Sequence, residues 1–209
     1  MARITFDSKG FETIPRDGYS VPVGASNIQE LSELLDTADL AALGPESRPG
    51  RWAAVKLNRR LDELFKGSRL DHGRQMLIRS LSLLWHDHLD ASHEISQDIP
   101  DADGSYLHGI MHRREPDYGN AKYWFNRVGK HPAFPLLAGQ VNGLQKEFSQ
   151  GEPMVVFPTR GVWDPFLFID ACEQALTSGD EKRIHRMERI QQLEFQVLLE
   201  WFCGGDELS

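Results

Sequence analysis

Three side chains that can bind a metal ion or move a proton share one face of a predicted helix near the middle of the chain. His108, His112 and Glu115 stand at positions i, i+4 and i+7, which places them on one stripe of an α-helix. His93 precedes them on another predicted helix. Imidazole and carboxylate groups are ligands for Zn, Fe, Mn and Ni. If the two helices pack together, the three histidines would bind a divalent ion, with Glu115 as a further ligand or general base.

The same histidines have a second interpretation, as polar core residues held by hydrogen bonds. His108 could bond Glu94 or Asn120, and His112 could bond Glu115 or Tyr118. Buried polar groups need partners, and such networks fix a fold without any ligand. The chain contains no HExxH motif and no CxxC pair. Spacing alone therefore leaves both interpretations open.

Basic and aromatic residues next to these histidines suggest a pocket for an anion or a small metabolite. Arg113 or Arg114 would supply a bidentate guanidinium and Asn120 an amide, while Tyr123 and Trp124 would form an apolar wall. In the alternative, one arginine pairs with a neighbouring carboxylate and the aromatic side chains belong to the core.

The elements that position these residues are two helices joined by a tight turn. Pro116 ends the first helix, the residues around Asp117 have turn chemistry, and Gly129 closes the second helix. This αα-hairpin resembles one tetratricopeptide unit at positions Gly109, Asp117, Tyr118, Ala121, Phe125, Val128 and Pro132. Residues 85–97 repeat part of the pattern, but no third copy follows, so a solenoid is excluded. The hairpin also suggests a protein-interaction scaffold.

Apolar periodicity and breaker residues predict helices along most of the chain. A helix is expected to begin near Ser26, with Gln29 in a capping box. Further helices are expected at 52–65, 71–85, 133–148, 164–178 and 180–202, with Asp71 and Asp164 as N-caps. Residues 86–88 continue a helix or form a turn, and 154–157 form an extended segment. The chain is predicted to be a single all-α domain, 1–209, of about seven or eight helices, with residues 1–25 as an irregular N-terminal arm.

Length and charge exclude several classes of function. The 209 residues carry a net charge of −8, which argues against duplex nucleic acid as a partner. No stretch reaches the roughly 20 apolar residues of a membrane span, and the first ten residues do not resemble a signal peptide. A cytoplasmic setting is expected. Cys172 and Cys203 are expected to be free thiols, and no base accompanies either as a nucleophile would require.

Three segments, SHEISQ, LHGIMHRREPDYGNAKYWFNRVGKHP and VWDPFLFIDACE, resemble an uncharacterised family of bacterial and fungal proteins of this size. The resemblance covers the chain from about residue 50 and implies no activity. It implies that one group of residues acts together: His93, His108, His112, Arg113, Arg114, Glu115, Asn120 and Trp124. The chain is therefore expected to bind a small molecule or a protein through a polar pocket. The alternative is a metal-dependent hydrolase or oxygenase that uses the same histidines.

Overall fold

The computed structural model describes residues 5–6, 12–13, 25–148 and 161–204. This part of the chain consists mostly of helices, which confirms the predicted all-α class. The helices are α1 Ala25–Glu33, α2 Ala54–Phe65, α3 His72–Trp85, α4 Leu89–Ser96, α5 Ala102–Arg114, α6 Tyr118–Val128, α7 Ala133–Phe148, α8 Pro165–Ser178 and α9 Glu181–Gly204. None of these helices is long and apolar enough to cross a membrane.

The N-terminal arm differs from the prediction. Two short strands, β1 Thr5–Phe6 and β2 Glu12–Thr13, pair antiparallel, with Thr5 opposite Thr13. Backbone hydrogen bonding between them therefore gives part of the arm a regular structure. The predicted extended segment at residues 154–157 lies outside the described residues.

Helix boundaries follow local signals in the sequence. Asp71 caps α3 by accepting from the Arg74 backbone N–H at 2.9 Å, and Asp164 caps α8 with Pro165 in its first turn. Residues 86–88, which the sequence predicts either to continue a helix or to form a turn, form a turn. Asp87 adopts a positive φ of 61°, which ends α3, so 89–96 is a separate helix. The described residues consequently contain more helices than the sequence predicted.

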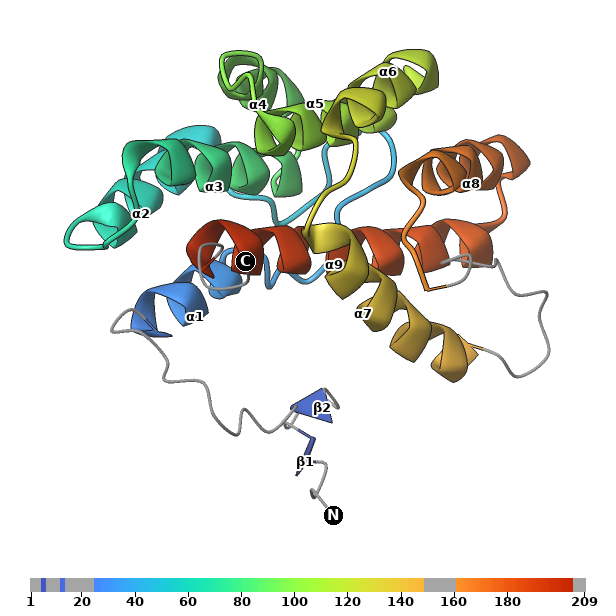
Figure 1. The fold of residues 1–209 in the computed structure, drawn as a ribbon, viewed down its shortest axis with the longest axis horizontal. Coiled ribbons are helices and arrows are strands. Elements are labelled where there is room, and N and C mark those ends of the chain that lie inside the picture. The colour runs from blue at the N-terminus through green and yellow to red at the C-terminus, as the bar shows by residue number, and fades with distance from the viewer. Residues whose placement is uncertain (1–4, 7–11, 14–24, 149–160, 205–209) are drawn as a thin grey trace.

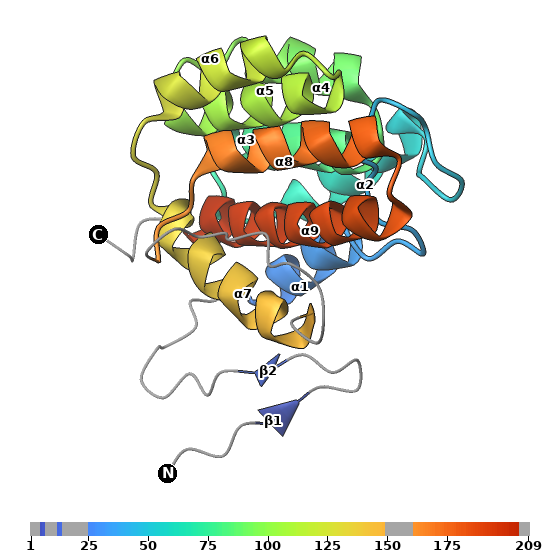
Figure 2. The ribbon, with the colours of Figure 1, turned by 90° about the vertical axis from the view of Figure 1, so that its right-hand side faces the viewer.

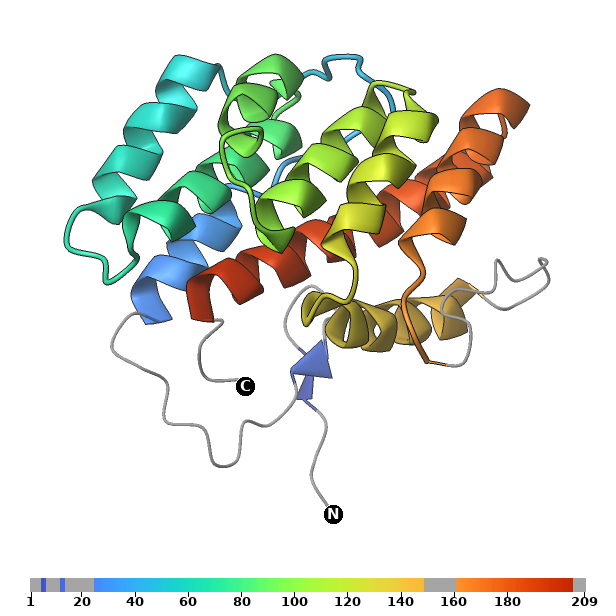
Figure 3. The same cartoon turned by 45° about the horizontal axis from the view of Figure 1, so that its top comes forward.

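The helices form layers around α9. Figures 1 and 2 show α9 running between one layer that includes α3, α5 and α8 and another formed by α1 and α7. Seen from above, α2 to α6 and α8 lie side by side as an array, and α9 crosses beneath it (Figure 3). The core is continuous across the layers; for example, the rings of Trp85 on α3 and Phe195 on α9 lie 5.3 Å apart. The role of the hairpin as an interaction scaffold stays a prediction.

Helices α5 and α6 form the predicted hairpin. Their close approach depends on Gly109, where a Cβ atom would lie 2.8 Å from the ring of Phe125. A larger residue would push the helices apart, so Gly109 sets the spacing at which side chains of α5 and α6 meet. The resemblance to a tetratricopeptide unit stays a prediction.

Candidate metal centre

Three histidines that are distant in the sequence meet between α4 and α5. His93 comes from α4, and His108 and His112 come from successive turns of α5. The ring centroid of His93 lies 4.5 Å from that of His108 and 5.8 Å from that of His112, while His108 and His112 are 4.9 Å apart. We refer to these three residues as the histidine triad. The sequence placed them in one group, and the structure brings them together.

The spacing of their ring nitrogens suits a single ion. Each residue of the triad offers one nitrogen, and these three nitrogens lie within 4.8 Å of one another. Three such points all lie within about 2.8 Å of a common point, which is 4.8 Å divided by √3. A Zn–N bond measures about 2.1 Å. Ring movements of less than about 1 Å would therefore bring all three nitrogens to bonding distance.

Helix α6 supports the triad from the side. The indole of Trp124 stacks on His108, with centroids 3.8 Å apart and ring planes 16° apart. The guanidinium of Arg127 lies 5.1 Å from the centroid of the same indole. The stack fixes the plane of the His108 ring, so this ligand is held in orientation by packing.

His112 is oriented by two polar neighbours. Its Nδ1–H donates to Glu115 Oε2 at 3.2 Å, and the Asn120 amide donates to its Nε2 at 3.0 Å. A carboxylate on the far nitrogen is the usual support for a metal-bound histidine. The Asn120 amide, however, takes the lone pair that an ion would need. Binding through Nε2 therefore requires the Asn120 side chain to turn its oxygen inward or withdraw.

Burial favours the neutral imidazole form of two residues of the triad, His108 and His112. Burial, together with the neighbouring His93 and His112, lowers the pKa of His108 to about 4. Burial also lowers the pKa of His112, and this effect outweighs the opposing charge of Glu115. Only neutral imidazole binds a metal ion, so the lowered pKa values keep His108 and His112 in the binding form at neutral pH. His108 Nδ1 is buried and has no hydrogen-bond partner.

The two arginines grouped with the triad by sequence lie elsewhere. Arg113 is buried against α9, where its guanidinium donates to Glu194 Oε2 at 2.5 Å and to Gln191 at 3.1 Å. Arg114 is equally buried and donates to Asp87 Oδ1 at 2.8 Å and to the Leu84 carbonyl. Helix geometry explains the correction, because consecutive residues are about 100° apart around the axis. Both arginines serve the core, and neither is placed to bind an anion beside the triad.

The two aromatic residues predicted to form the wall of that anion pocket, Tyr123 and Trp124, also have different surroundings. Trp124 packs on His108, but the neighbouring Tyr123 is 55% exposed. Of the predicted group, His93, His108, His112, Glu115, Asn120 and Trp124 come together, and the arginines do not.

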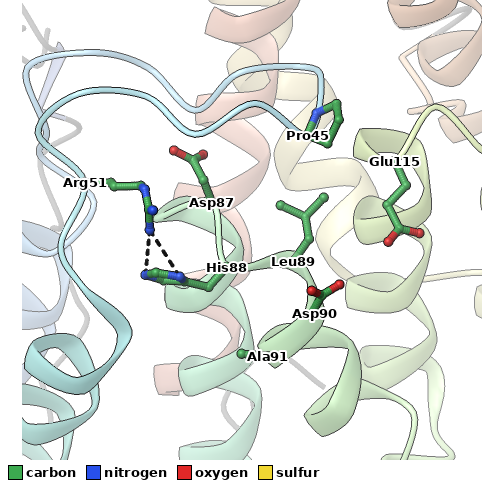
Figure 4. A pocket seen from close by; sticks show the side chains of 8 residues that line it. All are labelled: Pro45, Arg51, Asp87, His88, Leu89, Asp90, Ala91 and Glu115. Carbon is green, nitrogen blue, oxygen red and sulfur yellow. Dashed lines mark hydrogen bonds between the residues drawn. The ribbon is translucent and has the colours of Figure 1, made fainter.

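A pocket that the sequence did not predict opens beside Glu115. Its volume is about 370 Å³, and its lining residues are Pro45, Arg51, Asp87, His88, Leu89, Asp90, Ala91 and Glu115 (Figure 4). The lining comes from the loop before α2, the turn before α4 and the end of α5. Only Glu115 belongs to both the pocket and the surroundings of the triad. No local sequence pattern joins segments that lie this far apart in the chain.

The cysteines are free thiols, as predicted. Burial raises the pKa of both Cys172 and Cys203 to about 12. A thiol with so high a pKa is not a nucleophile at neutral pH. Among the described residues, the triad and the adjoining pocket therefore carry groups that could bind a ligand or take part in a reaction.

Comparison of the chain with family models, curated proteins and solved structures finds no match. The resemblance to a bacterial and fungal family therefore stays a prediction, and function has to be argued from the site itself.

Proposed function

We propose that this protein binds one divalent transition-metal ion on the histidine triad. The observation that carries the proposal is the convergence of three ring nitrogens within 4.8 Å of one another in a largely buried site. Three imidazoles with an open fourth position are a ligand set typical of catalytic zinc, and they also suit other first-row metals.

The chemistry of the surroundings favours an ion over a plain hydrogen-bonded network. Among the described residues, neither His93 nor His108 has a hydrogen bond to its ring, and His108 Nδ1 is buried. A buried nitrogen without a partner costs about 1–3 kcal/mol of folding stability. A bound cation would supply that partner, and the Glu115 carboxylate behind His112 would increase the basicity of this ligand.

An ion held by three histidines would leave a coordination position for water. Such a metal lowers the pKa of its bound water towards 7 and can activate it for hydrolysis. Glu115 lies beside His112 and also lines the neighbouring pocket, so a substrate bound there would be close to the centre. We therefore propose metal-dependent hydrolysis as the activity and a small molecule as the partner.

The charge of the chain supports a small molecule over nucleic acid as the partner. The net charge is −8, which disfavours binding to nucleic acid. A cytoplasmic setting is compatible with two free cysteines.

Metal analysis of protein purified without a histidine tag or a metal column tests the proposal. We expect close to one equivalent of Zn, Fe, Mn or Ni in the wild-type protein, and a large loss of it in His112→Ala. His72→Ala removes an exposed histidine and serves as the matched control. Apo-protein that fails to bind any of these ions when titrated would exclude the centre.

A further inference from the structure

The pocket beside Glu115 has opposite charges at opposite ends. Figure 4 shows Arg51 and His88 on one side and Asp90 and Glu115 on the other. Leu89 and the other apolar lining residues lie between the two ends. This separation matches a ligand that itself carries one positive and one negative group.

The Arg51 end is available to an anion. The Arg51 guanidinium lies 3.3 Å from His88 Nδ1, and no described carboxylate forms an ion pair with it. His88 Nε2–H donates to the Trp52 carbonyl at 2.8 Å, which leaves Nδ1 to accept from Arg51 and holds the guanidinium in place.

The opposite end is available to a cation. Within the described residues, Asp90 has no ion-pair partner, and Glu115 contacts only the ring of His112. The third carboxylate of the pocket, Asp87, is different because it is neutralised by Arg48 and Arg114. The unpaired charges of the pocket are thus one guanidinium at one end and two carboxylates at the other.

We propose that this pocket binds a small zwitterion of the amino-acid type. Its carboxylate would pair with Arg51, its ammonium group with Asp90 and Glu115, and its carbon chain would lie on Leu89 and Pro45. A guanidinium–carboxylate pair is directional and charge-assisted, so both ends contribute to recognition. The proposal does not depend on the metal centre, although Glu115 would place such a ligand next to it.

Isothermal titration of the metal-free protein with ω-amino acids, from glycine to 6-aminohexanoate, tests this proposal. We expect saturable binding that passes through an optimum of chain length, and at least about tenfold weaker binding of butylamine and butyrate than of 4-aminobutyrate, since each lost charged contact is worth roughly 1.5–3 kcal/mol. Arg51→Gln and Asp90→Asn should each weaken the binding of 4-aminobutyrate by about tenfold or more.

Matched controls separate the pocket from general charge effects. Arg59→Gln and Asp98→Asn change exposed residues outside the pocket and should leave binding unchanged. His112→Ala should abolish metal binding and retain zwitterion binding, so the two proposals fail separately. No saturable binding by any ω-amino acid, equal binding of butylamine, or unchanged binding in Asp90→Asn would overturn the proposal.

Discussion

Two groups of buried histidines in this protein have opposite surroundings. The backbone N–H of Trp52 donates to His86 Nδ1 at 3.1 Å, and His86 Nε2–H donates to the Leu34 carbonyl at 2.9 Å. His131 is held in the same way, between the Ala133 N–H at 3.1 Å and Asp103 at 2.7 Å. In both residues each ring nitrogen has one partner, which fixes the tautomer and ties separate parts of the chain together.

Two of the three histidines of the triad, His93 and His108, lack such hydrogen-bond partners among the described residues. His93 and His108 face other imidazoles, and only His112 has polar neighbours at both nitrogens. Where a buried imidazole has a structural role, as in His86 and His131, both ring nitrogens have hydrogen-bond partners. The difference indicates that the triad is not part of the same structural network, and it supports a role in which the three nitrogens share a cation.

The largest expected effect is on metal binding. His108→Ala should weaken metal affinity by at least about a hundredfold, because one of three ligands is removed from a site whose ligands act together. His86→Ala should leave the metal stoichiometry unchanged. Competition titration with a chromogenic chelator measures both affinities. A loss of metal in His86→Ala but not in His108→Ala would contradict the assignment of the triad as the metal site.

The free energy of unfolding should show the opposite order, with the larger loss in His86→Ala than in His108→Ala. His86→Ala leaves the Trp52 N–H and the Leu34 carbonyl unpaired inside the protein. We expect it to reduce the free energy of unfolding by about 2–6 kcal/mol, because each of the two unpaired groups costs about 1–3 kcal/mol. Urea denaturation followed by circular dichroism measures this value, and a change below about 0.5 kcal/mol would contradict the structural role of His86.

A smaller effect is expected at the carboxylate behind the triad. Glu115→Gln keeps the size of the side chain and removes its charge next to His112 Nδ1. Changes at such supporting groups weaken metal affinity by about 10–100-fold, so we expect a loss near the lower limit. Asp98→Asn, an exposed carboxylate away from the triad, is the matched control.

The pH dependence of stability should report His86. Burial lowers its pKa to about 4, below the value of about 6.5 that it has when unfolded. Between these values the unfolded chain binds more protons than the folded one, so the contribution of His86 is complete above pH 6.5 and is lost as the pH falls towards 4. Unfolding measured from pH 7.5 to 4.5 should show a shallower decline in His86→Gln than in the wild-type protein. Identical slopes would contradict this assignment.

The smallest expected effect distinguishes the two groups of histidines most sharply. His108→Phe keeps the stack on Trp124 and removes a buried nitrogen that has no hydrogen-bond partner. The metal-free variant should therefore be within about 1 kcal/mol of the wild-type protein in stability, since replacing an unsatisfied polar group costs little. A loss as large as that of His86→Ala would mean that the triad is a structural network.

The sequence predicted the local features of this fold and missed those that depend on distant contacts. Asp71, Asp164 and Pro165 mark helix starts within one turn, and the spacing of His108 and His112 follows from helix periodicity. Arg113 was misplaced because its partner Glu194 lies 81 residues further along the chain. No pattern in the neighbourhood of an arginine shows on which face of its helix a distant carboxylate will pack.

The pocket was missed for the same reason. Arg51 and Glu115 line its opposite ends although 64 residues separate them in the chain, and the Asp87 turn between α3 and α4 contributes to the lining. The sequence left open whether residues 86–88 continue a helix or form a turn. The three triad residues were found because two of them share a helix face and the third lies on the helix that packs against it.

Crystals of the untagged protein grown with zinc would test the central claim most directly, through anomalous diffraction on both sides of the zinc absorption edge. We expect one anomalous peak between α4 and α5, about 2.1 Å from one nitrogen each of His93, His108 and His112, with Asn120 turned away from His112 Nε2. A zinc-free triad in which water or Asn120 occupies the space between the rings would contradict it.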